Sequence, residues 1–404
     1  MSVFLKDFDK IYLYEELLYY INNSSFYKPY CQTIDLYEFF TNLLLGLVSN
    51  SPLVLLDADL NPLELAELKV EEVNKEKFIV KKQFATLIDL VTAVKTSFSE
   101  IIIFTSGTTG QPKQVRHTIQ TLTRSVRIGE FYQGQVWGFA YNPTHMAGLQ
   151  VFFQAFENLN TLVNLFNCSR LEINDLLKSE GITHLSATPT FYRLLLPIEK
   201  VFENVQRVTL GGEKSDQKLY GFIKRLFPYA KINNVYASTE AGSLLASKGE
   251  YFQIPESLSD KFRVENEELL IHKSLLGKSE SVQYYGDYYR TGDLIEWMDE
   301  KKGIFRFKSR KNELINIGGY KINPAEVEDV LLQMEGMQQA VVYGKPNSVL
   351  GHILCAELKV LPGVILTELQ VRRYLQDKLQ DFKIPRRIKF VEQFLLTRTG
   401  KIKR

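Results

Sequence analysis

A short apolar strand that ends in a loop of glycines and hydroxyl residues constrains this chain more than any other feature. Residues 101–104 (IIIF) are apolar throughout, and residues 105–113 (TSGTTGQPK) follow them directly. Glycines let backbone N–H groups approach phosphate oxygens, hydroxyls donate further hydrogen bonds, and the terminal lysine adds positive charge. We therefore predict that residues 105–113 form a phosphate-binding turn, and we call them the candidate phosphate loop.

The candidate phosphate loop is not the common GxxxxGK[ST] pattern, because Pro112 precedes the lysine and no Ser or Thr follows it. A flexible surface turn is the alternative interpretation, and the hydroxyls and glycines directly after an apolar strand argue against it. The predicted phosphate-binding residues are Thr105, Ser106, Gly107, Thr108, Thr109, Gly110 and Lys113.

Helical and strand patterns alternate along the first three quarters of the chain. Residues 36–48 have the apolar spacing of a buried helix, 53–56 predict a strand, and 176–185 contain a helix, a glycine stop and the start of a strand. This alternation predicts α/β architecture for a large N-terminal domain, residues 1–308, with helices layered on mixed sheets.

The last hundred residues or so have a different pattern. Pro324 opens a helix, two strand patterns (AVVYG and ILCAELKV) follow, and a second helix is predicted over 367–379. We expect residues 309–404 to form a small, mobile α+β domain attached through a charged hinge.

Composition excludes several classes of protein. The net charge of +2 lacks the basic excess of a nucleic-acid-binding surface. The three cysteines are far apart and odd in number, which favours a reducing compartment over a disulfide framework. No apolar run reaches the ~18 residues that span a bilayer, and the N-terminal segment MSVFLKDFDK lacks the apolar core of a signal peptide. We expect a cytoplasmic protein that binds neither nucleic acid nor membrane.

The candidate phosphate loop resembles the signature loop of the adenylate-forming superfamily, which comprises acyl-CoA synthetases, adenylation domains of peptide synthetases and luciferases. Four further segments resemble motifs of that family, in the expected order along nearly the whole chain. They are 234–240 (NVYASTE, for NxYGxTE), 289–293 (YRTGD), 309–326 (beginning SRKNELI, for GRxDxxIKxxGGxxIxPxEIE) and 399–404 (TGKIKR, for TGKIxR).

The resemblance implies that these segments surround one Mg²⁺-bound ATP. Tyr236 is expected to stack on adenine, Thr239 to contact phosphate, and Glu240 to coordinate Mg²⁺, which prefers carboxylate and phosphate oxygens together. Asp293 is expected to accept hydrogen bonds from the ribose hydroxyls, and Arg310 to contact ribose or phosphate. The implied nucleotide-binding set also contains Asn234 and Gly212.

The small domain carries three further implied roles. Lys401 corresponds to the family's catalytic lysine, whose ammonium stabilises the charge that develops as pyrophosphate leaves. Gly318 and Gly319 correspond to the segment that approaches the pantetheine arm of coenzyme A. Asn312 stands at the hinge position, where the family usually has Asp or Lys.

The acyl pocket is predicted from softer matches. His145, within residues 143–148 (PTHMAG), resembles a gating residue of the family, although a packed or surface histidine is the alternative. The turn at Gly211 lacks the proline of the family's GGxP, so an ordinary strand-end turn is nearly as good an interpretation. With Ala241 and Gly242, these residues outline a small, mostly apolar pocket, which favours an aryl or short-to-medium acyl acid over an amino acid.

The implied activity is that of an acid–thiol ligase, which forms acyl-AMP and pyrophosphate and then transfers the acyl group to a thiol. Coenzyme A is the first choice, and the phosphopantetheine of a free-standing acyl or peptidyl carrier protein is the alternative. The short chain is similar in outline to compact o-succinylbenzoate–CoA ligases, whose substrate does not carry over on that basis. Departures from the family pattern at Gln114, Ala237 and Ser309 also allow a non-catalytic nucleotide-binding regulatory homologue.

Overall fold

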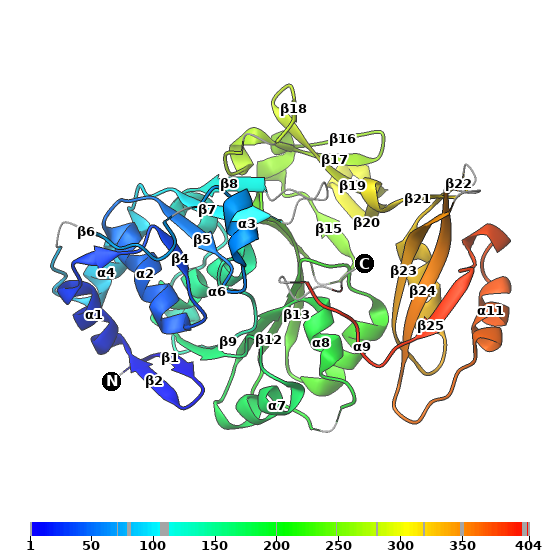
Figure 1. Ribbon diagram of the computed structural model, residues 1–404, viewed down its shortest axis with the longest axis horizontal. Helices are drawn as coiled ribbons and strands as arrows, with labels where there is room; N and C mark the ends of the chain where they lie inside the picture. The colour runs from blue at the N-terminus through cyan, green and yellow to red at the C-terminus, as the bar shows by residue number, and fades with distance from the viewer. Residues whose placement is uncertain are drawn as a thin grey trace.

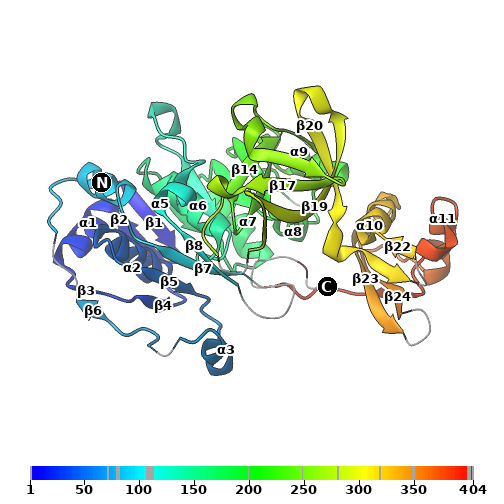
Figure 2. The same ribbon diagram turned by 90° about the horizontal axis from the view of Figure 1, so that it is seen from above.

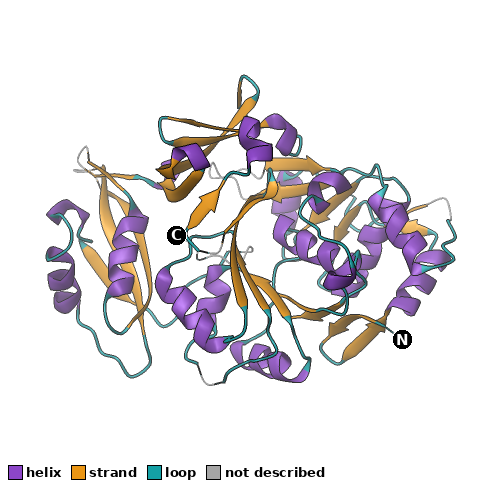
Figure 3. Cartoon of the chain, turned by 180° about the vertical axis from the view of Figure 1, so that it is seen from behind, coloured by secondary structure: helices purple, strands orange, loops and turns teal. Residues whose placement is uncertain are grey.

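The structure is a computed structural model that describes residues 2–70, 72–78, 82–105, 113–198, 200–247, 249–279, 282–317, 320–347, 351–397 and 402. A large body, blue to yellow in Figure 1, carries most of the chain, and a smaller part, orange to red, stands at one side of it. Figure 3 shows from behind that helices pack around the sheets of the large body. The predicted α/β class, with a large N-terminal and a smaller C-terminal part, is confirmed.

An eight-stranded sheet forms the centre of the large body. Its order is β14 (Gly242–Ser247), β13 (Lys231–Ser238), β12 (Arg207–Gly211), β11 (His184–Ala187), β9 (Val136–Phe139), β10 (Thr161–Asn164), β1 (Val3–Asp7) and β2 (Lys10–Leu13). The strands from β13 to β1 are parallel, and only the two edge strands are antiparallel to their neighbours.

Helices connect the parallel strands of this sheet. They are α6 (Met146–Phe156), α7 (Arg170–Ser179), α8 (Pro189–Leu194) and α9 (Gln217–Leu226). Because parallel strands end at the same edge of a sheet, ligands of such sheets bind beyond the carboxyl ends of the strands. The segments that follow β9, β12 and β13 hold His145, the Gly211 turn and Thr239–Glu240, so these predicted site residues share one edge.

A second, four-stranded sheet carries the ends of the candidate phosphate loop. Its order is β4 (Tyr30–Gln32), β5 (Leu53–Leu56), β7 (Ile101–Thr105) and β8 (Lys113–His117). β7 and β8 are antiparallel, and Thr105 pairs with Lys113, so the loop leaves and returns at neighbouring positions. Residues 106–112 themselves lie outside the described residues.

The elements around the four-stranded sheet complete the N-terminal third of the chain. They are α1 (Tyr14–Asn23), α2 (Leu36–Val48), α3 (Pro62–Glu67), α4 (Leu87–Lys95), α5 (Ile119–Thr123), the 3-10 helix η1 (Glu130–Tyr132) and the short pair β3 (Phe26–Tyr27) and β6 (Lys77–Phe78). The helix predicted over 36–48 and the strand over 53–56 are confirmed with the same bounds.

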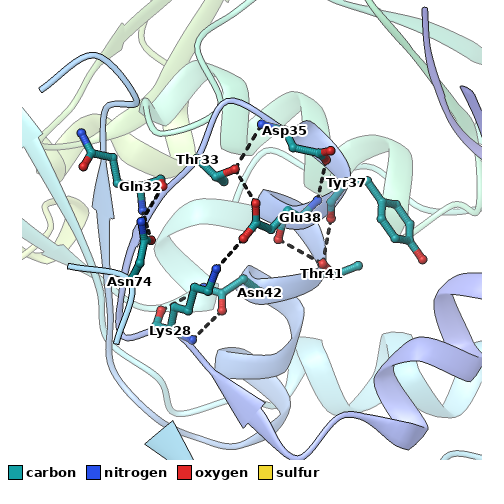
Figure 4. A network of polar contacts seen from close by, with 9 residues as sticks. All are labelled: Lys28, Gln32, Thr33, Asp35, Tyr37, Glu38, Thr41, Asn42 and Asn74. Atoms are coloured by element: carbon teal, nitrogen blue, oxygen red, sulfur yellow. Dashed lines mark hydrogen bonds and ion pairs between the residues drawn. The ribbon is translucent and has the colours of Figure 1, made fainter. Parts of the chain in front are cut away.

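The start of α2 is held by a network of polar side chains (Figure 4). Asp35 caps the helix by accepting from the backbone N–H of Glu38 at 2.9 Å, and the Glu38 carboxylate accepts from Thr33 at 2.6 Å and from Lys28 at 2.5 Å. Burial works against the charge, but these two donors lower the pKa of Glu38. Asn42 exchanges two hydrogen bonds with the backbone of Lys28, so the helix is fixed to the segment between β3 and β4.

A third sheet has six strands, all antiparallel to their neighbours: β15 (Tyr251–Gln253), β20 (Ile304–Arg310), β19 (Tyr288–Asp299), β17 (Glu268–His272) and β16 (Phe262–Glu265), with β18 (Tyr284–Tyr285) paired to β19. The 3-10 helices η2 (Glu256–Lys261), η3 (Lys273–Leu275) and η4 (Glu300–Lys302) lie between these strands along the chain. The bend from β19 to β20 brings the YRTGD segment alongside residue 310.

The C-terminal part has its own apolar core. After η5 (Lys311–Glu313) come β21 (Ile315–Ile317), β22 (Tyr320–Ile322), α10 (Pro324–Gln333), β23 (Met337–Asn347), β24 (Gly351–Val360), α11 (Glu368–Gln376), η6 (Asp381–Lys383) and β25 (Arg387–Phe390). Val327, Leu331, Val342 and Leu358 are buried in this core. Pro324 opens α10 as predicted, and the small part is α+β. The boundary after residue 308 stays a prediction.

Two lysines connect the small part to the large body near α9. Lys218 donates from Nζ to the backbone carbonyls of Leu332 and Met337, both at 2.8 Å, and Lys214 pairs with Asp329 at 2.5 Å. The Leu332 carbonyl lies at the carboxyl end of α10, where a cation also stabilises the helix dipole. Residues 391–397, which follow β25, run back toward the large body in both views (Figures 1 and 2). Within the described residues, no helix is long and apolar enough to cross a membrane.

Candidate functional site

Three predicted nucleotide-binding residues from three different strands meet at one carboxylate. The Tyr236 hydroxyl donates to Asp293 Oδ2 at 2.6 Å, and Arg310 Nε donates to Asp293 Oδ1 at 2.7 Å. Asp293 and Arg310 face each other across β19 and β20, whereas Tyr236 reaches them from β13. Asp293 is only 6% exposed, and a buried carboxylate requires partners of this kind. We call these three residues the Asp293 cluster.

The protonation states in the Asp293 cluster follow from burial and charge. Burial, together with the Asp293 carboxylate, raises the pKa of Tyr236 well above its ordinary value, so the phenol stays a neutral donor. Burial alone would lower the pKa of Arg310, but the charge and hydrogen bond of Asp293 raise it overall. Each Asp293 oxygen accepts one of these bonds, and a carboxylate offers about four acceptor positions. Among the described residues, two positions therefore stay available for donors such as ribose hydroxyls.

The ring of Tyr236 already has an aromatic neighbour. Its centroid lies 4.5 Å from that of Phe307, with the planes tilted by 30°. The expected stacking on adenine stays a prediction. The sequence pattern did not indicate the hydrogen bond from Tyr236 to Asp293, because the two residues are 57 positions apart.

The turn that follows β13 carries Thr239 and Glu240. The Glu240 side chain is half-buried, and its carboxylate makes no hydrogen bond or ion pair with any other residue that the structure describes. After burial, the charge of Glu240 is the main cause that raises the pKa of the Tyr289 phenol. A half-buried, acceptor-only group without a partner fits a hard cation such as Mg²⁺.

Backbone carbonyls of this turn are bound from outside the eight-stranded sheet. His117 Nε2 lies 2.8 Å from the Thr239 carbonyl, Gly277 N–H donates to the Glu240 carbonyl at 2.7 Å, and Arg124 donates to the Ala241 carbonyl at 3.4 Å. His117 and Arg124 were not predicted from the sequence. No local motif marks them, since each is more than a hundred positions from its acceptor.

The predicted pocket histidine belongs to a second polar cluster. His145 precedes α6, and its Nε2 lies 3.4 Å from Asp57 Oδ1. Asp57, which directly follows β5, also accepts from Asn142 at 3.1 Å and from the Thr144 hydroxyl. Nε2 is buried and makes no hydrogen bond among the described residues, and the gating role stays a prediction. Asp57 was not singled out from the sequence.

The other predicted pocket residues lie near α6 as well. Ala241 is buried, and a Cβ placed on Gly242 would lie 2.9 Å from Gln150 Nε2. A Cβ on Gly211 would lie 3.6 Å from the Tyr141 hydroxyl. Gln150 accepts from Ser243 at 2.7 Å. The residues thus gather at one end of the sheet, and their role toward a substrate stays a prediction.

Several predicted residues are not placed in the site. The Asn234 amide donates to the Gly249 carbonyl at 3.3 Å instead of reaching the Asp293 cluster. Gly212 follows β12 in the turn at the sheet edge. Ser106, Gly107, Thr108, Thr109, Gly110, Gly318, Gly319 and Lys401 lie outside the described residues, as do the side chains of Thr105 and Asn312.

Two family models match this chain. Residues 55–262 match the family model of the AMP-binding enzyme, and residues 326–401 match that of the AMP-binding enzyme C-terminal domain. The chain belongs to the AMP-binding enzyme family. Thr239, Glu240 and all four predicted pocket residues lie inside the first match, and Lys401 is the last residue of the second.

Curated relatives cover part of the chain. A 2-succinylbenzoate–CoA ligase from Staphylococcus aureus (strain MSSA476) is 28% identical over 333 residues, which are 75% of this chain and 65% of that protein. Gramicidin S synthase 2 from Brevibacillus brevis is 26% identical over 353 residues, which are 75% of this chain and 8% of the synthase. The chain therefore spans just under two thirds of the ligase and a small part of the synthase.

Solved structures share the fold over nearly the whole chain. The o-succinylbenzoate CoA synthetase MenE from Bacillus subtilis, in complex with the acyl-adenylate intermediate OSB-AMP, has a TM-score of 0.72 at 19% identity and covers 99% of this chain and 94% of that one. ATP-bound MatB from Rhodopseudomonas palustris has a TM-score of 0.74 at 16% identity, with the same coverage. At these identities the likeness establishes the fold.

Proposed function

We propose that this protein is an AMP-forming acid–thiol ligase that activates a carboxylic acid with ATP and passes the acyl group to coenzyme A. One observation carries the proposal. Tyr236 and Arg310 both donate to the buried Asp293 carboxylate, which has spare acceptor positions, beside a turn whose Glu240 carboxylate has no partner among the described residues. Ribose hydroxyls match the first feature, and a cation bound to phosphates matches the second.

Each predicted site residue that the structure describes in this region has a role in holding the nucleotide. Asp293 accepts from the ribose hydroxyls, while Tyr236 and Arg310 fix the carboxylate in place. Thr239 contacts phosphate through its hydroxyl, and Glu240 holds Mg²⁺, which supplies charge neutralisation at the phosphates when bound. Lys113, at the start of β8, adds positive charge at the end of the candidate phosphate loop.

The reaction proceeds in two displacements. A carboxylate oxygen of the acid attacks the α-phosphorus of ATP, and the bond from that phosphorus to pyrophosphate breaks. The thiolate form of the thiol then attacks the acyl carbonyl carbon, and the bond from that carbon to the phosphate oxygen breaks, with its electron pair leaving on AMP. Positioning and charge neutralisation contribute most in such steps. Lys401 neutralises charge in the first step, and rotation of the small domain brings Gly318 and Gly319 in for the second.

The acid and the thiol are the finer parts of the proposal. The pocket outline at Gly211, Ala241 and Gly242 favours an aryl or short-to-medium acyl acid, and the similarity to 2-succinylbenzoate–CoA ligases supports coenzyme A as the acceptor. The similarity to gramicidin S synthase 2 keeps a carrier protein as the second candidate acceptor. The three cysteines are all free thiols, which fits the cytoplasm as the place of action.

Acid-dependent exchange of pyrophosphate into ATP tests the proposal. A panel of aryl, short-chain, medium-chain and amino acids should contain at least one that supports exchange, and the same acid should then form a thioester with coenzyme A. A phosphopantetheinylated carrier protein in the second assay distinguishes the two acceptors. If folded protein binds ATP but exchanges with no acid in the panel, the ligase proposal is wrong and a nucleotide-binding regulatory role replaces it.

A further inference from the structure

The three sheets of the large body meet at the turn that carries Thr239 and Glu240. The turn itself connects β13 to β14 of the eight-stranded sheet. His117, which reaches the Thr239 carbonyl, is the last residue of β8 in the four-stranded sheet. Gly277, which donates to the Glu240 carbonyl, follows η3 in the connection between β17 and β18 of the six-stranded sheet.

His117 is fixed tightly in this position. The residue is only 1% exposed, and its Nδ1 lies 3.1 Å from the Thr121 hydroxyl while Nε2 lies 2.8 Å from the Thr239 carbonyl. A Cβ on Gly277 would come within 2.5 Å of the imidazole, so only glycine leaves room for the ring. Arg116 and Lys278 exchange two backbone hydrogen bonds, at 2.8 and 2.9 Å, which hold the Gly277 segment against β8.

The protonation of His117 suits a donor to a carbonyl. Burial lowers the pKa of His117 to about 4, so the imidazole is neutral near neutral pH. A neutral imidazole has one N–H, and since a carbonyl only accepts, that N–H is at Nε2 and points to Thr239. Nδ1 is then an acceptor 3.1 Å from the Thr121 hydroxyl, which also lies 2.9 Å from the Thr118 carbonyl, the other acceptor for its one hydrogen.

Arg124 adds a second tie from the same segment of the chain. It follows α5, seven positions after His117, and its Nη1 donates to the Leu275 carbonyl at 3.0 Å and to the Ala241 carbonyl at 3.4 Å. Together with the Gly277 N–H, the three donors bind the carbonyls of residues 239, 240 and 241 in succession. With its backbone held at three consecutive residues, the turn has little freedom to change the direction of the Glu240 side chain.

The same strand also bears one end of the candidate phosphate loop. Lys113 is the first residue of β8 and His117 is the last. The five residues of β8 therefore join the predicted phosphate-binding loop to the turn that presents the predicted metal carboxylate. The spacing between these two parts of the nucleotide site depends on the bond from His117.

We propose that His117 and Arg124 are positioning residues that hold the Thr239–Glu240 turn at a fixed place relative to β8 and its first residue, Lys113, so that Glu240 and Lys113 engage one Mg²⁺-bound nucleotide. The inference rests on the proposed function, since it assumes a nucleotide at this edge of the sheet. The competing explanation is that His117 contributes only to the packing of three sheets, in which case its loss lowers stability without changing the affinity for MgATP.

The variant His117→Ala tests the proposal in the full-length protein. Loss of a residue that orients a metal-binding group typically costs on the order of 10- to 100-fold in affinity, so we expect a rise of at least tenfold in the Kd for MgATP measured by calorimetry. In ATP–pyrophosphate exchange, the KM for MgATP should rise by a similar factor while the KM for the acid stays within about twofold. His117→Gln, which keeps an amide donor near the place of Nε2, should recover most of the loss.

His184 provides the matched control. It is also a buried histidine whose pKa is lowered to about 4 by burial, but it contacts Trp137 and Thr183 at the opposite ends of the strands. His184→Ala should lower the thermal unfolding temperature and leave the affinity for MgATP unchanged. If His117→Ala does not fold, Thr121→Val replaces it, with an expected rise of about two- to tenfold in Kd. Thermal unfolding is measured beside binding, because the Thr121 hydroxyl also bonds the backbone N–H and carbonyl of Thr118 at the start of α5.

A double-mutant cycle with Glu240→Gln separates positioning from packing. If His117 acts through Glu240, the losses in MgATP affinity should not add, and the difference between wild type and His117→Ala should shrink when EDTA removes Mg²⁺. Wild-type affinity in His117→Ala, or full additivity, overturns the positioning role and leaves the proposed function intact. Failure of the wild-type protein to bind MgATP overturns both.

Discussion

Replacement of Asp293 by Asn is the sharpest test of the nucleotide site, because it removes the charge and preserves the shape. Asp293 accepts from Tyr236 at 2.6 Å and from Arg310 at 2.7 Å. A hydrogen bond to a charged group is worth about 1.5–3 kcal/mol and one between neutral groups about 0.5–1.5 kcal/mol. The Arg310 side chain is about half exposed, with 51% of its surface accessible, so solvent screens its share. We expect Asp293→Asn to lower the free energy of unfolding by about 1–2 kcal/mol.

The effect on catalysis should be larger than the effect on stability. A ribose that donates to both spare positions of the carboxylate loses at least one charge-assisted bond when an amide replaces one oxygen. The loss of about 1.5–3 kcal/mol corresponds to a fall of about 10- to 150-fold in kcat/KM for ATP. The KM for the acid should change much less. The assays are ATP–pyrophosphate exchange at varied ATP and urea unfolding followed by circular dichroism.

Glu296 offers a control on the same two strands. It pairs across β19 and β20 with Arg306 at 2.7 Å, in the same kind of contact as Asp293 and Arg310. The side chains of Glu296 and Arg306 are both about 45% exposed. Glu296→Gln should change stability by less than about 1 kcal/mol and leave kcat/KM for ATP unchanged. If the two variants reduce kcat/KM for ATP equally, or if Asp293→Asn reduces only stability, the assignment of Asp293 to the ribose is wrong.

Three further predictions concern other parts of the chain. Lys401→Ala should slow adenylate formation by on the order of 10²–10³ and spare thiol transfer from pre-made acyl-AMP, and equal losses in both half-reactions would argue against its role. Burial raises the pKa of Glu157 to about 7, so the folded protein favours the protonated carboxyl. The stability that this preference contributes is full below the ordinary pKa of a glutamate and is lost as pH rises through about 7. Urea unfolding should show a loss of about 2–4 kcal/mol over this range, and the loss should disappear in Glu157→Gln. Lys218→Met should weaken the contact between α9 and α10, and limited proteolysis near residues 309–314 should become faster than in wild type.

Local patterns in the sequence predicted many of the elements and the general class of the fold. The helix over Leu36–Val48 and the strand over Leu53–Leu56 were predicted with their final bounds, because both are apolar runs with clear turn signals at their ends. Pro324 was predicted to open a helix, since proline at the first helical position loses no hydrogen bond. The motifs also identified residues that prove to be neighbours, such as Asp293 and Arg310.

No local pattern in the sequence predicts the contacts between distant segments. The bond from His117 to Thr239 joins residues 122 positions apart and depends on the arrangement of three sheets. The pairing of His145 with Asp57 depends in the same way on how β5 lies against the end of β9. A histidine at the end of a strand has the same local sequence whether its ring faces solvent or a carbonyl of another sheet.

Residues that face a ligand can be recognised in the sequence, whereas the residues that hold them in place cannot. The motif residues supply groups that face a ligand, and their chemistry can be recognised residue by residue. The residues that hold them, such as His117 and Gly277, contact backbone atoms, which every sequence has. Because a carbonyl carries no side-chain identity, nothing in the sequence of the turn requires a histidine as its partner. A donor from any strand at the right distance would serve, so such positioning residues become visible only when the sheets are placed against one another.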